Sequence, residues 1–161
     1  MAQSSETTSG PRIGHVHLKV ADLERAIAFY RLLGFEVMQH FGTQAAFLGA
    51  DGYHHHIGLN TWQSAGAPPA PPGHAGLYHL AVLYPDRAAL ARVLTRVLEA
   101  GFALEGAADH GVSEAVYLRD PDGNGVELYR DRAPEDWPRD RAGQLAMGNA
   151  RLDVAALLAE A

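Results

Sequence analysis

The sequence predicts an α+β fold in which two βαβββ modules form one curved mixed sheet, shaped like a cup. The first observation is an internal repeat. Residues 13–35 and 77–102 each run from a histidine on an alternating strand, through an aspartate and an apolar-periodic helix, to a Gly-Phe pair. A shift of 64 residues superposes His15 on His79. The second observation is that three short strand-like runs follow each predicted helix, so one unit occurs twice.

Each module is predicted to begin with a strand and an amphipathic helix. Asp22 and Asp86 are good N-caps, and Gly34 and Gly101 are placed to close the two helices. Between these residues, apolar side chains recur at the spacing of a helix with one buried face. They are Leu23, Ala26, Ile27, Tyr30 and Leu33 in the first helix, and Leu90, Val93, Leu94 and Val97 in the second.

The runs after each helix have the alternation and apolar content of short strands. They cover residues 36–40, 44–48 and 54–60 in the first module, and 103–107, 113–119 and 126–129 in the second. Glycine-containing turn signals separate consecutive runs. Each module therefore has the order strand, helix and three strands.

A single domain at residues 13–132 is predicted to hold both modules. The modules cover 13–62 and 76–130, and a linker at 63–75 joins them, because its proline and glycine content suits neither helix nor strand. Residues 133–161 form a C-terminal extension that ends in an amphipathic helix. We expect this extension to cover a sheet edge or a partner subunit.

Composition restricts the partners of the chain. A formal net charge of −6 argues against the basic surface that a nucleic-acid backbone requires, so small molecules are expected instead. No apolar run approaches the ~18 residues of a membrane span. Residues 1–12 are predicted to be a disordered tail without signal-peptide features, and we expect a cytoplasmic protein. Because the chain has no cysteine, any metal ion must be bound by imidazole and carboxylate groups.

Strand alternation places three potential metal ligands on the face that points away from the helices. Apolar residues alternate with His15 and His79 in the first strand of each module, and with Glu127 in the last strand. Two imidazoles and one carboxylate suit Fe(II), and Mn(II), Ni(II) and Zn(II) accept the same ligands. A lone strand histidine is more often a hydrogen-bonded surface or core residue. The symmetry of His15 and His79 under the repeat favours the metal site.

The segments GHVHLKVADLERAIAFYRLLGFEV and DPDGNGVELY closely resemble the vicinal oxygen chelate superfamily. This superfamily contains glyoxalase I, extradiol dioxygenases, bleomycin-binding proteins and epimerases, and the resemblance covers about residues 13–132. The segments YHHHIGLNTW and DHGVSEAVYLRDPDGNGVELY are most similar to extradiol ring-cleaving dioxygenases related to catechol 2,3-dioxygenase. The resemblance implies a metal-centred cup, an aromatic substrate, O2 and a homodimer.

The same resemblance implies that one histidine before the linker is an acid–base catalyst. His55 matches that residue in a His-x-x-x-Leu motif. Simple alternation along the strand instead points His54 and His56 into the cup, and exposed loop histidines are a further alternative. The residues predicted to line the substrate are His17, His56 and Asn60.

The resemblance also implies two catalytic residues in the second module. Tyr117 lies ten residues before Glu127 and matches a hydrogen-bond donor to a substrate oxygen. The alternative is an aromatic residue in the strand core. His110 matches the pocket histidine that precedes this tyrosine, and it lies seven residues before it.

These expectations predict a metal-dependent extradiol dioxygenase that cleaves a catecholic aromatic with O2, and Fe(II) is the expected metal. The alternatives are a glyoxalase I-like lyase or isomerase and a small-molecule binding protein of the bleomycin-resistance type. Glyoxalase I usually supplies a carboxylate ligand from the strand at 54–60, where this chain has neither Asp nor Glu. A pure binding protein needs no metal triad, so the set His15, His79 and Glu127 disfavours that alternative.

Overall fold

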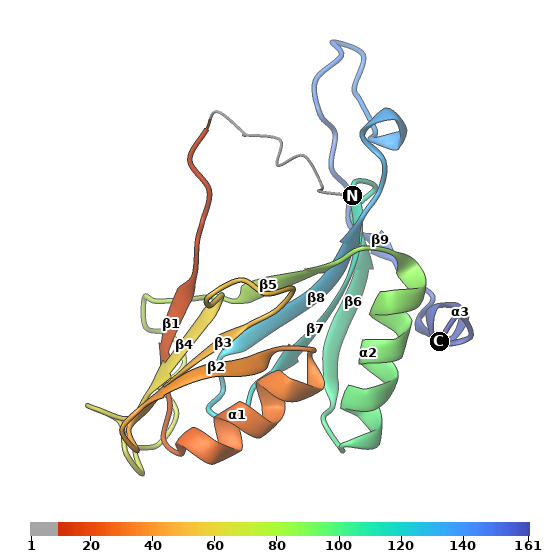
Figure 1. Ribbon diagram of the computed structural model, residues 1–161. Helices are drawn as coiled ribbons and strands as arrows, with labels where there is room; N and C mark the ends of the chain where they lie inside the picture. Colours follow the sequence, from red (N-terminus) through yellow and green to blue (C-terminus); the bar gives the residue numbers. More distant parts are fainter. Residues whose placement is uncertain (1–9) are drawn as a thin grey trace, which may run out of the picture.

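The computed structural model describes residues 10–161 and contains two β-sheets with helices packed against them (Figure 1). The first module contains β1 (Val16–Lys19), α1 (Leu23–Leu32), β2 (Glu36–Phe41), β3 (Ala45–Gly49) and β4 (Ile57–Asn60). The second contains β5 (Leu80–Tyr84), α2 (Arg87–Glu99), β6 (Leu104–Asp109), β7 (Ser113–Arg119) and β8 (Gly125–Asp131). A short 3-10 helix (Pro134–Asp136), β9 (Ala150–Arg151) and α3 (Val154–Leu158) follow. The tail predicted at 1–12 lies mostly outside the described residues.

The two modules have equivalent strand orders, which confirms the predicted α+β class and the repeated unit. The order is β1-β4-β3-β2 in one sheet and β5-β8-β7-β6-β9 in the other. In both, the first strand pairs in parallel with the last strand of the module, and the remaining pairs are antiparallel. The strands form two separate mixed sheets, one of four strands and one of five, and β1 and β5 are edge strands.

The helices have the predicted caps and buried faces. The carboxylates of Asp22 and Asp86 accept hydrogen bonds from the backbone N–H groups three residues further on, at 2.9 and 2.7 Å. After the helices, Gly34 and Gly101 have φ angles of 103° and 88°, a backbone region that glycine adopts at low cost. The apolar side chains predicted to face the core are all buried. Local signals therefore suffice to place both helices.

One continuous hydrophobic core runs through both modules, and buried hydrogen bonds cross it. Tyr30 Oη donates to Asp120 Oδ2 at 2.9 Å, and Tyr84 Oη donates to the Leu33 carbonyl oxygen at 2.8 Å. Asp120 also accepts from the backbone and side-chain nitrogens of Asn124 at 2.9 Å. The turn after β7 is therefore bonded to α1 of the other module.

The largest difference from the predicted strands concerns the histidines before β4. The strand predicted at 54–60 begins only at Ile57, and residues 54–56 are not in a strand. A turn that contains Asp51 and Gly52, with φ angles of 51° and 75°, follows β3, and the chain pairs with the sheet again only at Ile57. The predicted extent of this strand is wrong, so alternation does not determine where His54 and His56 point.

The C-terminal extension packs onto the second module. β9 pairs antiparallel with β6, with Asp109 opposite Ala150, and Leu157 of α3 is fully buried. Figure 1 shows the chain between the 3-10 helix and β9 extending beyond the sheet before it returns. None of the helices between residues 10 and 161 combines the length and apolar character needed to cross a membrane.

Candidate active site

His79 and Glu127 meet at the start of the second sheet. His79 directly precedes β5, and Glu127 lies on β8 opposite Ala81 of β5. A Cβ at Gly125 would lie 2.1 Å from the Tyr78 carbonyl oxygen, so the close approach of β8 to this segment requires glycine. His79 Nε2 and Glu127 Oε2 are 2.9 Å apart, and both side chains are partly exposed.

The separation of these two atoms suits two ligands of one ion as well as a hydrogen bond. Ligand atoms bound at about 2.1 Å and at right angles to each other lie about 3 Å apart. Within residues 10–161, however, no three His, Asp or Glu side chains are grouped closely enough to hold a metal ion. The structure thus brings together two of the three predicted ligands and leaves His15 apart. The ligand roles of all three stay predictions.

Tyr117 and His110 extend the pair into a series of polar contacts. Tyr117 lies opposite Glu127 in the β7–β8 register, and its Oη is 3.4 Å from Glu127 Oε1 and 2.7 Å from His110 Nε2. His110 Nδ1 is 2.9 Å from the Gly148 carbonyl oxygen, which can only accept, so Nδ1 carries the proton. Partial burial and the nearby Glu127 carboxylate raise the pKa of Tyr117 to about 12. Tyr117 is therefore a protonated donor at neutral pH.

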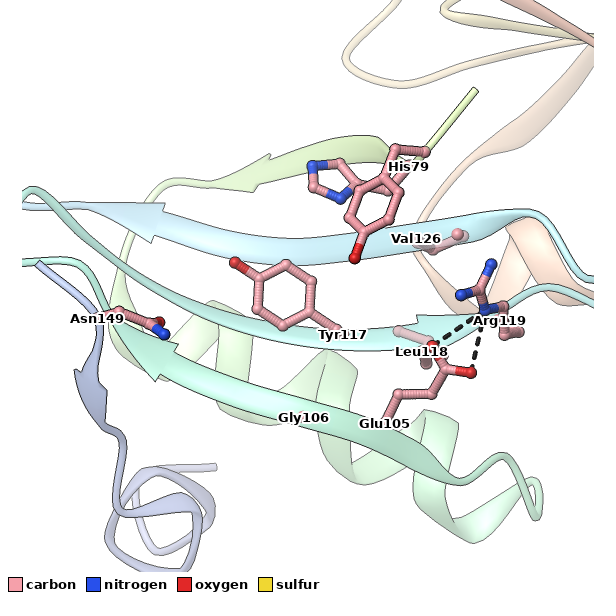
Figure 2. Close-up of a pocket in the computed structure, with 10 residues that line it drawn as sticks. His79, Glu105, Gly106, Tyr117, Leu118, Arg119, Val126 and Asn149 are labelled. Carbon is pink, nitrogen blue, oxygen red and sulfur yellow. Dashed lines mark hydrogen bonds and ion pairs between the residues drawn. The ribbon is translucent and has the colours of Figure 1, made fainter. Parts of the chain in front are cut away.

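A cavity of about 400 Å³ opens beside this series, a volume within the range of small-molecule sites. Figure 2 shows the side chains of His79, Tyr117 and Asn149 on the same side of the second sheet. At the end of the cavity away from Asn149, Arg119 Nε lies 3.0 Å from both carboxylate oxygens of Glu105. The cavity wall therefore carries an ion pair between Arg119 and Glu105.

Three of these wall residues were missed by reasoning from the sequence. Arg119 follows Tyr117 by two residues on β7 and so shares its face, which is a signal that strand alternation contains. Glu105 faces the same cavity from the neighbouring strand β6. Asn149 has no local signal, because it reaches the cavity only through the pairing of β9 with β6.

The histidines of the first module form a separate cluster. The rings of His15 and His55 have centroids 4.5 Å apart, and His55 Nδ1 lies 2.7 Å from His54 Nδ1. Partial burial of the ring and the adjacent His15 lower the pKa of His55, which keeps it neutral at pH 7. His15 also lines a second cavity of about 850 Å³, to which His56 and His79 contribute. His15 and His79 therefore line the same cavity, but His79 is not part of the cluster that His15 forms with His54 and His55.

Two of the predicted substrate-lining residues make contacts within the first module. His17 packs over Gly58, and its ring centroid lies 5.8 Å from that of Trp62. Asn60 is 8% exposed, and its Oδ1 accepts a hydrogen bond from the Trp62 backbone N–H at 3.2 Å. Neither His17 nor Asn60 lines the cavities of about 400 and 850 Å³. Of the three, His56 alone lines one of them, and its contact with substrate stays a prediction.

The modules differ at the position that Glu127 occupies. In β4, Gly58 follows Ile57, which pairs with the first residue of β1. In β8, Glu127 follows Val126, which pairs with the first residue of β5. Gly58 and Glu127 are therefore equivalent positions. A Cβ at Gly58 would lie 2.7 Å from the His17 ring, so that ring takes the space of a side chain. The first module therefore has no counterpart of Glu127.

Comparison with known proteins identifies the family. The model of the Glyoxalase/Bleomycin resistance protein/Dioxygenase superfamily matches residues 12–128. Catechol-2,3-dioxygenase of Bacillus subtilis (strain 168) is 44% identical over 150 residues, which are 92% of this chain and 52% of that protein. Biphenyl-2,3-diol 1,2-dioxygenase 3 of Rhodococcus globerulus is 32% identical over 132 residues, 80% of this chain and 69% of that protein. The chain spans about half the length of the Bacillus relative.

Solved structures agree on the fold. A glyoxylase/bleomycin resistance protein/dioxygenase domain from Frankia sp. EAN1pec has a TM-score of 0.63 at 22% identity, covering 77% of this chain and 100% of its own. A lactoylglutathione lyase from Agrobacterium tumefaciens has a TM-score of 0.58 at 26% identity, covering 76% and 96%. With the family model matching most of the chain, these findings confirm the resemblance: the chain belongs to the Glyoxalase/Bleomycin resistance protein/Dioxygenase superfamily.

Proposed function

We propose that this chain is a metal-dependent extradiol dioxygenase that cleaves a catecholic aromatic ring with O2. The observation that carries the proposal is the series His79, Glu127, Tyr117 and His110, which are linked by polar contacts of 2.9, 3.4 and 2.7 Å. This series borders a cavity large enough for a substituted aromatic ring. Two relatives named as dioxygenases support the reaction class.

The proposed metal ligands are His15, His79 and Glu127, and the proposed ion is Fe(II). Imidazole and carboxylate donors suit first-row divalent ions, and Mn(II), Ni(II) or Zn(II) accept the same set. The support from the structure is the close approach of His79 to Glu127, together with the cavity that His15 shares with His79. A bound cation supplies positive charge that lowers the pKa of a catechol hydroxyl beside it.

The remaining residues act on protons and on orientation. His110, with its proton on Nδ1, holds the Tyr117 hydroxyl through Nε2. Tyr117 keeps its proton at neutral pH; it donates this proton to His110 Nε2 in the structure, and its O–H rotates to donate to a substrate oxygen when substrate is bound. The lowered pKa of His55 favours its neutral form, and in the tautomer whose Nδ1 donates to His54 Nδ1, His55 Nε2 is free to accept the catechol proton.

The two alternative functions predict different chemistry at the same cavity. A glyoxalase I-like isomerase usually uses a carboxylate from the first module, and the equivalent of Glu127 there is Gly58, covered by His17. A protein that only sequesters an aromatic ligand has no use for a positioned Tyr117 donor beside Glu127. Both observations rank these functions below ring cleavage.

The test is ring cleavage of a panel of catechols by protein loaded with Fe(II) under anaerobic conditions and then exposed to O2. We expect consumption of O2 together with a yellow ring-cleavage product. Glu127→Ala should lose both, whereas Glu135→Ala, which removes an exposed carboxylate of the 3-10 helix that follows β8, should keep both. Conversion of a hemithioacetal by the Ni(II) or Zn(II) form indicates the isomerase. Tight binding of aromatic ligands without O2 consumption indicates the sequestering protein.

A further inference from the structure

The part of the C-terminal extension before β9 is attached directly to the candidate active site. The Gly148 backbone N–H donates to the His110 carbonyl oxygen at 3.0 Å, and His110 Nδ1 contacts the Gly148 carbonyl oxygen at 2.9 Å. Pro138 packs against Gly111, where an added Cβ would lie 2.8 Å from the proline ring. The extension lies beyond residue 128, where the match to the family model ends. The extension therefore contacts a predicted catalytic residue from outside the part of the chain that the family model matches.

Asn149 is held in place on both sides. The residue before it makes the two hydrogen bonds to His110, and the residue after it, Ala150, pairs with Asp109 at the start of β9. These contacts fix the backbone of Asn149, so its side chain starts from a defined point at the edge of the cavity.

The amide of Asn149 faces the space that a substrate ring would occupy. Asn149 lines the cavity of about 400 Å³ together with His79 and Tyr117. Figure 2 shows its side chain on the same side of the sheet as Tyr117, at the end opposite Arg119. Among the residues drawn, hydrogen bonds connect only Arg119 and Glu105, so none ties the Asn149 amide to this wall. The amide offers a donor and an acceptor to a ligand.

We propose that Asn149 is a substrate-contacting residue that determines which ring substituent the cavity accepts. This inference rests on the proposed ring cleavage and extends it to the substrate class: catechols with a neutral substituent that carries a hydrogen-bonding oxygen. The reacting hydroxyls lie at His79 and Tyr117, and the substituent extends toward Asn149. Asn149 is exposed, so a bound substituent displaces water from its amide; an oxygen on the substituent restores the hydrogen bond, and an apolar group does not.

The test compares two substituents of equal size. 3,4-Dihydroxybenzyl alcohol and 4-ethylcatechol differ by the exchange of a hydroxyl for a methyl group, and the 2,3-dihydroxybenzyl and 3-ethyl isomers cover the other ring position. We expect the protein to prefer the alcohol of one isomer pair. Asn149→Ala should reduce that preference in kcat/KM by about 10-fold, the effect of one hydrogen bond. The loss should appear in KM, since the contact is equal in the ground and transition states.

Met147→Ala is the matched control, because Met147 is 60% exposed in the same segment and does not line this cavity. It should keep the preference of the unmodified protein. An unchanged preference in Asn149→Ala, or no preference for the alcohol in the unmodified protein, overturns the inference.

The dissociation constants of the same compounds, measured by calorimetry without O2, separate this inference from the proposed function. Failure to cleave any catechol sinks the ring-cleavage proposal, while a 10-fold loss of binding preference in Asn149→Ala still supports the contact. Ring cleavage with an unchanged binding preference leaves the function standing and removes the role of Asn149.

Discussion

Tyr117→Phe is the substitution that best separates catalysis from folding at this site. The Tyr117 hydroxyl has a close partner, His110 Nε2 at 2.7 Å, and a distant one, Glu127 Oε1 at 3.4 Å. The second distance exceeds the normal O–H···O range of about 2.5–3.0 Å, so only one hydrogen bond contributes to folding. Because water can reach this cavity, loss of the hydrogen bond to His110 should lower the free energy of unfolding by about 1 kcal/mol or less.

The expected effect on turnover is much larger. A positioned donor to developing charge on a reacting oxygen typically contributes about 10²–10³-fold in rate, or about 2.7–4 kcal/mol. Tyr117→Phe should therefore lower kcat by that factor. It should leave the amount of bound metal unchanged, since the proposed ligands His15, His79 and Glu127 are all retained. The assay is kcat with a cleaved catechol, combined with metal analysis and urea unfolding.

Tyr84→Phe is a matched control with the opposite expected signature. It removes the buried hydrogen bond to the Leu33 carbonyl oxygen, so it should reduce stability by about 1–3 kcal/mol and leave kcat within a few-fold. If Tyr117→Phe also leaves kcat within about threefold, Tyr117 is not the donor.

His110→Asn adds a second check on the same reasoning. Asparagine keeps a donor for the Gly148 carbonyl oxygen and removes the ring nitrogen that holds the Tyr117 hydroxyl. If the two residues act as one unit, the double variant should lose little more activity than Tyr117→Phe alone. Losses that multiply would show that His110 acts independently of Tyr117.

Two further predictions concern the metal and the junction between the modules. Glu127→Ala and His15→Ala should each weaken Fe(II) binding by at least about 100-fold in an anaerobic titration, and unchanged affinity in either variant removes that residue from the ligand set. Asp120→Ala should lower the free energy of unfolding in urea by about 3–5 kcal/mol, because it leaves the buried Tyr30 hydroxyl and the nitrogens of Asn124 without an acceptor. Tyr30→Phe should cost less, and equal losses would contradict this explanation.

Several features of the fold follow from local sequence. The caps Asp22 and Asp86 and the glycines Gly34 and Gly101 act on neighbouring backbone groups, so their effect does not depend on distant contacts. Apolar periodicity indicates which helix face is buried, because the order of side chains along the helix determines which of its faces is apolar. The internal repeat then predicted two equivalent modules, which the strand orders confirm.

Within each strand, the sequence also determined which residues share a face, but not where each strand begins. His54 and His56 show this limit, because a turn at Asp51 and Gly52 keeps them out of β4. The turn needs left-handed backbone at two positions, a choice that the local pattern of three histidines does not reveal.

Tertiary structure alone decided how the candidate site is assembled. His79 and Glu127 are 48 residues apart in the chain and meet through the parallel pairing of β5 with β8, while His15 stays beside His55. Asn149 enters the cavity wall because β9 pairs with β6. These contacts depend on how sheets and modules pack, and packing is determined by the combined burial of many side chains. A local pattern reports which face of an element is buried, but it does not report which distant element that face contacts.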